Sequence, residues 1–110
     1  MLPKNKRIPR KLFPLLKNPE QSFRNNPFFV KIARNKEASA RFCVSVSKKV
    51  AKNAVLRNKI RRLGYRILGE YVDRIKRPIL VQVSFSSLPK SANEVRTGLG
   101  QILIKANLIK

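Results

Sequence analysis

The sequence predicts an α+β fold in a single domain, residues 1–110, because it carries both strand patterns and helix patterns. Apolar and polar side chains alternate in three segments, as in half-buried strands, and apolar residues recur at helical spacing in two others. The predicted strands cover 28–34, 39–47 and 79–85, and the predicted helices cover 53–71 and 91–106. With 110 residues and 43% apolar side chains, the chain can bury one modest core.

Residues 1–20 form a basic N-terminal segment that we expect to be partly flexible. The first 17 residues include six basic side chains and no acidic one. Pro9 can open a helix and Pro14 fits only the first turn of one, so a third helix here should be short or irregular. An apolar patch lies within this segment, made of Leu12, Phe13, Leu15 and Leu16.

The first two strands should form an antiparallel hairpin. In the strand over 28–34, large apolar residues occupy every second position, and 35–38 is predicted to be the turn that follows. The strand over 39–47 has the same pattern, and its Cys43 should be a buried, unreactive thiol. Two asparagine–proline segments, 18–19 and 25–27, are predicted to be turns ahead of the hairpin.

The helix after the hairpin has one apolar and one cationic face. Asn53 is a suitable N-cap. The apolar stripe contains Leu56, Ile60, Leu63, Ile67 and Tyr71. At about 100° per residue, the opposite face carries Asn58, Arg61, Arg62 and Tyr65. Gly64 lies mid-helix, where it costs about 1 kcal/mol relative to alanine, and the close approach of another backbone would explain its presence.

The last helix begins at a capping-box sequence, Ser91-Ala92-Asn93-Glu94. Its buried side should carry Val95, Leu99, Ile102, Leu103 and Ala106. Between the two helices, Glu70 and Asp73 are the only close acidic pair. An arginine follows each of them four residues later, Arg74 and Arg77, at the spacing of helix-stabilising ion pairs. We therefore interpret the pair as a solvated helix end rather than a metal site or an acid–base dyad.

Charge is the strongest compositional signal. The chain has 26 Lys and Arg against 5 Asp and Glu, a formal net charge of +21, which favours a polyanionic partner: nucleic acid first, an anionic membrane second. Histidine is absent, so zinc sites of the His/Cys type and Ser-His or Cys-His nucleophiles are excluded. No apolar run reaches the ~18 residues of a membrane span, and no secretory apolar region follows the basic start. We expect a cytoplasmic protein with neither a membrane nor a small-molecule substrate as partner.

The cations concentrate around the basic helix, where 47–66 contains eight Lys or Arg and no acid. A solvated helix face usually mixes charge signs, and like-charged pairs such as Arg57 and Arg61 oppose helix formation by a few tenths of a kcal/mol. Retaining such pairs makes physical sense if phosphates lie against this face. Tyr65 adds a ring that could stack on a base.

This segment resembles the signature of the bacterial ribonuclease P protein family. The motifs are Ser47-Lys48-Lys49, Asn53-Ala54-Val55 and Arg57-Asn58-Lys59-Ile60-Arg61-Arg62, in this order. The order of helices and strands agrees over nearly the whole chain. The resemblance implies a small, ribosomal-protein-like sandwich of a mixed sheet with about three helices, and a left-handed crossover around the basic helix.

The resemblance also implies that the chain is the protein subunit of ribonuclease P, which removes the 5′ leader of precursor tRNA. The protein would hold no catalytic residue, and the required Mg²⁺ would be held by the RNA. Residues implied to bind the catalytic RNA are Lys48, Lys49, Lys52, Arg57, Asn58, Lys59, Arg61, Arg62, Tyr65 and Arg66. Residues implied to bind the precursor leader are Phe13, Leu16, Phe29 and Lys31. Lys59 stands where the family has arginine, and Leu16 or Lys17 stands where it has a second aromatic residue. A further family arginine falls on Tyr65 or Arg66.

Two other classes of function remain open from the sequence. Composition alone would suit a structural RNA-binding protein, such as a ribosomal protein. The net charge would also suit a membrane-active or DNA-compacting basic protein. Asn58 within the arginine cluster and the strand-rich remainder of the chain argue against both non-specific alternatives.

Overall fold

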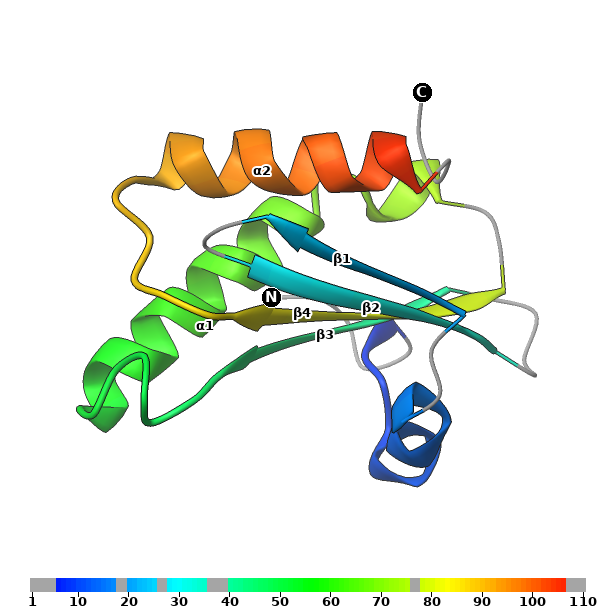
Figure 1. Cartoon of the computed structure of the whole chain (residues 1–110), viewed down its shortest axis with the longest axis horizontal. Coiled ribbons are helices and arrows are strands. Elements are labelled where there is room, and N and C mark those ends of the chain that lie inside the picture. The colour runs from blue at the N-terminus through cyan, green and yellow to red at the C-terminus, as the bar shows by residue number, and fades with distance from the viewer. Residues whose placement is uncertain (1–5, 18–19, 26–27, 36–39, 76–77, 107–110) are drawn as a thin grey trace.

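The computed structural model describes residues 6–17, 20–25, 28–35, 40–75 and 78–106 of the chain (Figure 1). Its helices are η2 (Arg10–Lys17), α1 (Ala54–Leu68), η3 (Val72–Arg74) and α2 (Ala92–Lys105), of which η2 and η3 are 3-10 helices. Its strands are β1 (Gln21–Asn25), β2 (Phe28–Arg34), β3 (Arg41–Val46) and β4 (Ile79–Phe85). The predicted α+β class is confirmed, as are the strands over 28–34 and 79–85.

The sheet is mixed, with its strands in the order β1-β2-β4-β3. β1 pairs antiparallel with β2, β2 pairs antiparallel with β4, and β3 pairs parallel with β4. The predicted hairpin of 28–34 with 39–47 is therefore wrong, because β4 lies between the two strands. The sequence of β4 explains its central position. Ile79, Leu80 and Val81 are buried in succession, so this strand is apolar toward both faces of the sheet.

β1 is absent from the predicted elements. Its five residues contain one large apolar side chain, Phe23, so no alternation marks them as a strand. The strand forms because its backbone pairs with the edge of β2 along its whole length. The turns predicted at 18–19, 26–27 and 36–38 lie outside the described residues, whereas Asn25 is the last residue of β1.

The two faces of the sheet are covered by different helices. α1 and α2 pack on one face, and Figure 1 shows η2 on the opposite side of the sheet from α2. The main core includes Phe28, Val30, Phe42, Val44, Val81, Val83, Ile67, Leu68, Val95, Leu99, Ile102 and Leu103. A smaller cluster under η2 consists of Ile8, Leu16, Ala33 and Leu80. The predicted buried side of the last helix is thus confirmed, and the sheet is apolar on both faces where η2 covers it.

η2 confirms the prediction of a short, irregular helix near the N-terminus. It is a 3-10 helix that holds Pro14 in its interior. Proline lacks the backbone N–H that an α-helix would use at this position, so the segment winds more tightly instead of forming a regular α-helix.

Gly64 and Gly98 allow the two α-helices to lie close to the sheet. A Cβ on Gly64 would lie 2.8 Å from Cγ1 of Val44 in β3, and a Cβ on Gly98 would lie 2.5 Å from Cε2 of Phe28 in β2. Both distances are well below the ~3.5 Å at which carbon atoms make favourable contact. Gly64 therefore packs against sheet side chains, and not against another backbone as we expected.

Both predicted N-caps are confirmed. Asn53 Oδ1 accepts a hydrogen bond from Val55 N at 2.7 Å, and Ser91 Oγ accepts one from Glu94 N at 3.1 Å. Glu94 Oε1 in turn accepts a hydrogen bond from Lys90 N at 3.3 Å. The first turn of α2 is thus held by reciprocal hydrogen bonds between its side chains and its backbone.

α1 is the crossover connection between the parallel strands β3 and β4. The helix ends at Leu68, before the predicted end of the apolar stripe, and η3 follows. The left-handed sense of this crossover stays a prediction from the resemblance.

Candidate nucleic-acid interface

The exposed side of α1 and the turn before it carry a dense set of basic side chains, which we call the α1 cationic surface. It consists of the basic residues Lys48, Lys49, Lys52, Arg57, Lys59, Arg61, Arg62 and Arg66, together with the amide Asn58 among them. All of these residues are exposed except Arg57, which is half-buried. α1 contains no acidic residue, so no charge on the helix itself offsets these cations.

Arg57 holds the lysine-bearing turn against the helix. Its Nη1 donates hydrogen bonds to the backbone oxygens of Ala51, at 3.0 Å, and Lys52, at 2.8 Å. The turn is also closed by backbone hydrogen bonds from Val50 N and Ala51 N to Ser47 O. Arg57 therefore acts within the protein as a structural link, in addition to any contact that it makes with RNA.

Asn58 and Arg61 orient each other on the exposed side of α1. Arg61 Nη2 donates a hydrogen bond to Asn58 Oδ1, one helical turn away. Because both side chains are exposed and hydrogen-bonded to each other, the guanidinium and the amide lie side by side and present their remaining donors to solvent. Arginine in such an arrangement is suited to binding phosphate with two hydrogen bonds.

Tyr65 does not belong to the α1 cationic surface, which corrects the prediction that its ring stacks on a base. Its side chain is 7% exposed and belongs to the main core. Burial raises the pKa of the Tyr65 hydroxyl, whereas a hydrogen bond with the Val44 backbone lowers it. A ring packed against β3 has no free face to offer to a nucleotide.

The apolar stripe of α1 is rotated relative to the predicted one. The buried residues of the helix are Ile60, Gly64, Tyr65, Ile67 and Leu68, while Leu56 is 39% exposed. Glycine is not counted when an apolar stripe is identified from hydrophobic periodicity. Gly64 nevertheless lies on the side of α1 that comes closest to the sheet. Gly64 was therefore the signal in the sequence that could have placed Tyr65 inside the protein.

Cys43 is half-buried and not fully buried as predicted. Burial raises the pKa of its thiol, while a hydrogen bond with Tyr65 and the charge of Arg61 lower it. The net upward shift keeps the sulfur protonated near neutral pH, and a protonated thiol is a poor nucleophile.

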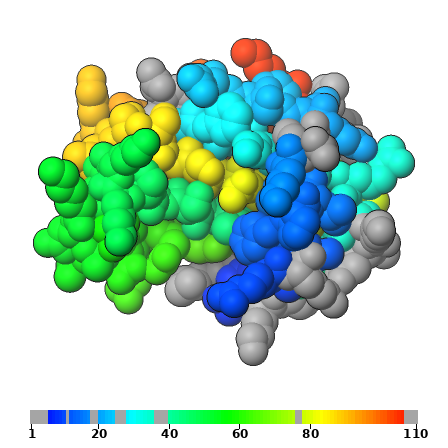
Figure 2. Space-filling model, turned by 60° about the horizontal axis from the view of Figure 1, so that its bottom comes forward, coloured from blue at the N-terminus to red at the C-terminus, as the bar shows by residue number. Residues whose placement is uncertain are grey.

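The face of the sheet opposite α2 has a second candidate surface, which we call the open sheet face. It comprises the side chains of Ser22, Arg24, Phe29, Lys31, Cys43, Ser45, Gln82 and Ser84, which alternate with the core residues of their strands. Figure 2 shows this side of the molecule hollowed between η2, in blue, and α1, in green. Strand residues in cyan and yellow form its floor.

Phe29 lies at the centre of this surface with cations beside it. Arg24 Cζ is 5.3 Å and Lys31 Nζ is 5.7 Å from the centroid of its ring. On the neighbouring strand, Ser84 lies opposite Phe29, and its Oγ is 3.0 Å from Oγ of Ser45. An aromatic ring flanked by positive charge and hydroxyls is the combination that binds single-stranded nucleic acid by stacking. Sequence reasoning missed Arg24, because it missed β1.

Of the two η2 residues predicted to bind RNA, only Phe13 is accessible. Phe13 is half-buried and packs against the small cluster under η2. Leu16 is 3% exposed and lies inside that cluster with Ala33 and Leu80. The structure therefore corrects the assignment of Leu16, which is a core residue that anchors η2 to the sheet.

Three acidic residues of the described segments, Glu20, Glu70 and Glu94, are engaged with the protein itself, and Arg77, the predicted partner of Asp73, lies outside the described residues. Glu70 binds Arg96 of α2, with Arg96 Nη2 3.0 Å from Glu70 Oε2, and this hydrogen-bonded partner lowers the pKa of Glu70. This pairing replaces the predicted one with Arg74. Glu20 lies 3.4 Å from Arg34. Within the described residues, no three His, Cys, Asp or Glu side chains come together in a way that could hold a metal ion.

No helix within the described ranges is both long enough and apolar enough to cross a membrane.

Comparison with known proteins places these surfaces in context. The family model for ribonuclease P matches residues 2–107 of the chain. No curated protein matches it significantly. A 2.0 Å structure of the Staphylococcus aureus RNase P protein is similar, with 28% identity and a TM-score of 0.81, covering 96% of this chain and 98% of that one.

Two further solved structures are similar. Another structure of the RNase P protein from Staphylococcus aureus has 29% identity and a TM-score of 0.72, and the match covers 100% of this chain and 96% of that one. The RNase P protein from Thermotoga maritima has 22% identity and a TM-score of 0.73, covering 90% of this chain and 96% of that one. At that identity the likeness supports the fold alone.

Proposed function

We propose that this chain, which belongs to the ribonuclease P protein family, binds two RNA molecules with two separate surfaces of one domain. It is the protein subunit of ribonuclease P, the ribonucleoprotein endonuclease that matures the 5′ end of tRNA together with its RNA subunit. The proposal concerns which surface contacts which RNA and what each contact contributes.

The α1 cationic surface is the proposed site for the RNA subunit. The observation that carries this proposal is a helix whose exposed side bears five basic residues and no acid, continuous with three lysines of the preceding turn. Phosphates placed against this side would remove the repulsion between like charges and release counterions from the RNA. Asn58 and Arg61, held together by their hydrogen bond, would bind a phosphate or base edge in a defined orientation.

The open sheet face is the proposed site for the 5′ leader of precursor tRNA. Phe29 would stack on a leader base, and Lys31 and Arg24 would contact the adjacent phosphates. Phe13, half-buried on η2, would contribute a second ring. Stacking supplies about 1–3 kcal/mol per base without reading the base sequence, which suits a site that must accept many different leaders.

We assign the chemistry to Mg²⁺ ions held by the RNA subunit. Such ions activate water and neutralise the developing charge in phosphodiester cleavage. Among the residues that the structure describes, no cluster fits a metal site: Glu20 and Glu70 pair with arginines, and Glu94 caps α2. The protein would therefore act by binding substrate and neutralising phosphate charge, in the cytoplasm, where we propose that it meets precursor tRNA.

The decisive experiment is cleavage of precursor tRNA by a bacterial ribonuclease P RNA at low Mg²⁺, with and without this protein. We expect protein-dependent release of an intact 5′ leader. Binding to the RNA without any stimulation would overturn the proposed substrate contact and favour a purely structural RNA-binding role.

Two sets of variants separate the surfaces. Arg61→Ala and Arg62→Ala should weaken binding to the RNA subunit and lower the slope of log K against log salt by about 0.7–0.9 per lost phosphate contact. Lys105→Ala, at the far end of α2, is the matched control. Phe13→Ala and Phe29→Ala should weaken binding of leader-bearing precursor and leave binding of mature tRNA unchanged. Equal losses for both tRNAs would exclude a leader site on the sheet.

A further inference from the structure

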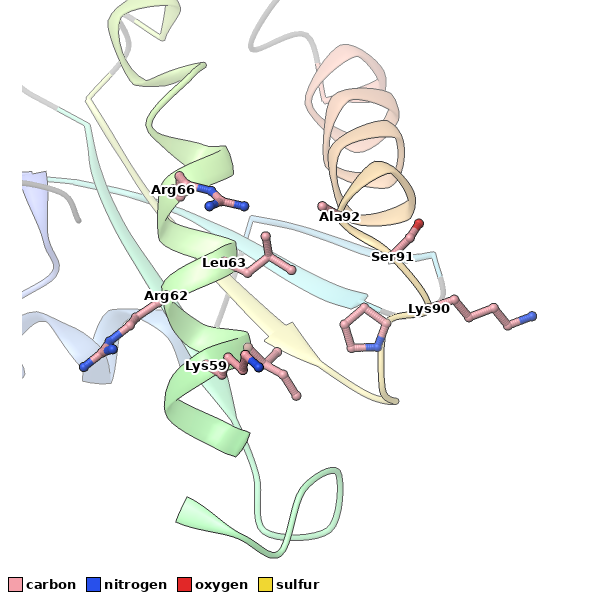
Figure 3. Close-up of a pocket in the computed structure, with 9 residues that line it drawn as sticks. Lys59, Arg62, Leu63, Arg66, Lys90, Ser91 and Ala92 are labelled. Atoms are coloured by element: carbon pink, nitrogen blue, oxygen red, sulfur yellow. The ribbon is translucent and has the colours of Figure 1, made fainter. Parts of the chain in front are cut away.

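A groove of about 750 Å³ lies between α1 and the start of α2, separate from the open sheet face (Figure 3). One wall is formed by α1 with Lys59, Leu63 and Arg66, and the other by the loop and first turn of α2 with Pro89, Lys90 and Ala92. Its volume lies within the roughly 300–1,000 Å³ of typical small-ligand sites.

The side chains of α1 that line this groove extend in different directions. In Figure 3, Leu63 and Arg66 point from α1 toward α2, whereas the side chain of Arg62, which also lines the groove, extends away from α2. Lys59, one turn before Leu63, also lines the groove. Three cations of the α1 cationic surface, Lys59, Arg62 and Arg66, therefore also border an apolar surface.

The groove combines apolar walls with basic ends. Leu63, Pro89 and Ala92 offer apolar surface, while Lys59, Arg62 and Arg66 bring positive charges from α1. Lys90 adds a fourth charge at the outer rim, where its side chain extends away from α1 (Figure 3). Glu94 is the carboxylate at this end of α2, and it already accepts a hydrogen bond from Lys90 N. Ser91 Oγ likewise accepts from Glu94 N, so the helix start is capped by the chain itself and any anion here would be held by the side-chain cations.

We propose that this groove holds one unpaired nucleotide of the ribonuclease P RNA. The base lies against Leu63, Pro89 and Ala92, and the flanking phosphates lie on Arg66 and Lys90. A nucleotide is the ligand that joins a flat apolar body to adjacent negative charges, which is the complement of these walls. The inference rests on the proposed function and extends the contact of the RNA subunit around α1 to the first turn of α2.

The RNA subunit is the expected source of this nucleotide because of where the groove lies. It shares α1 with the proposed binding surface for that RNA, and its second wall is α2, which Figure 1 shows across the sheet from η2. The proposed leader site is on the η2 side. A leader that stacks on Phe29 would therefore have to pass around α1 to reach the groove.

Two substitutions on the α2 wall test the groove without touching the α1 cationic surface. Ala92→Phe fills the groove and removes no charge, so binding of the RNA subunit should weaken about tenfold with an unchanged salt slope. Lys90→Gln should lower the salt slope by about 0.7–0.9, as expected for one lost phosphate contact. Thr97→Phe and Lys105→Gln, both exposed on α2, control for added bulk and lost charge and should behave as wild type.

A photocrosslinker at the same place identifies the occupant. With p-benzoylphenylalanine in place of Ala92, crosslinking in the assembled holoenzyme should map to one or a few unpaired nucleotides of the RNA subunit. Crosslinks to the precursor leader instead, or wild-type affinity for both Ala92→Phe and Lys90→Gln, would overturn the inference. In that case wild-type protein would still stimulate cleavage, whereas failure of the proposed function itself would appear as no stimulation by wild-type protein.

Discussion

Gly64→Ala should destabilise the protein, although alanine is the better helix former. On a solvent-exposed helix this substitution would stabilise by about 1 kcal/mol. Here the new Cβ would lie 2.8 Å from Cγ1 and 3.3 Å from Cγ2 of Val44, and 3.4 Å from Cε2 of Phe85. Val44 is buried and β-branched, so it cannot easily turn away. The overpacking cost should therefore reach about 2–3 kcal/mol, which leaves a net loss of roughly 1–2 kcal/mol.

Urea unfolding followed by circular dichroism measures this loss, and the melting temperature should fall by roughly 5–10 °C. Gly69→Ala is the matched control, because Gly69 is exposed at the end of α1 with an ordinary helical φ of −57°. In a Val44→Ala background, alanine at position 64 should become neutral or stabilising, because the clashing methyl groups are gone. A Gly64→Ala protein more stable than wild type, or an equal loss in both backgrounds, would refute the reasoning.

The remaining predictions concern three other sites. Leu16→Ala should lower the free energy of unfolding by about 2–5 kcal/mol, because Leu16 is buried under η2; unchanged stability with weaker leader binding would contradict its role in the core. Cys43 should react with iodoacetamide more slowly in the folded than in the unfolded protein near pH 8, because burial raises its pKa and reduces the thiolate; equal rates would count against this. The hydrogen bond with Arg96 lowers the pKa of Glu70 in the folded protein. The pairing therefore stabilises the folded state at pH values above the unfolded pKa, and this stabilisation is lost as the pH falls through the folded pKa. The difference in the free energy of unfolding between wild type and Glu70→Gln should therefore be constant near neutral pH and disappear as the pH falls below the ordinary glutamate pKa, and a difference that stays the same in acid would be the contrary result.

Helices and strands were predictable where burial of one side produces a periodic pattern of apolar residues in the sequence. β2 and β4 alternate clearly, and α2 has both a capping box and a complete apolar side. The cap of α1 at Asn53 followed from its side chain alone, which can accept a hydrogen bond from the first turn. These signals are local, and each needs only one element and the side that it buries.

The order of the strands could not be predicted in the same way. Alternation in 28–34 and 39–47 reports that each strand is half-buried, but not which strand lies next to it. β4 lies between β2 and β3 because its first three residues, Ile79, Leu80 and Val81, are apolar toward both faces. This property predicts a central position only when β4 is compared with all the other strands. β1 has one large apolar residue, Phe23, and is defined by backbone pairing that leaves no mark in the sequence.

The α1 cationic surface was largely predictable from sequence, because charged residues on a helix stay outside unless they are paired. Lys59, Arg61, Arg62 and Arg66 are all exposed, as the helical spacing indicated. Amphipathic residues were harder to place, since a tyrosine suits both the core and an RNA surface. The side of α1 that faces β3 is set by Gly64, and its position turned Tyr65 inward.

Because α1 is the crossover between β3 and β4, the surface on this helix lies at a fixed distance from the surface on the sheet. The helix connects two neighbouring strands of one sheet, and Gly64 packs it directly against Val44 of β3, so the core holds α1 in place on the sheet. If the helix holds the RNA subunit and the sheet holds the leader, the distance between catalytic RNA and substrate is set by the thickness and width of the sheet itself. The protein would then hold the substrate at a set distance from the catalytic RNA and so position the cleavage site, without contributing a reacting group.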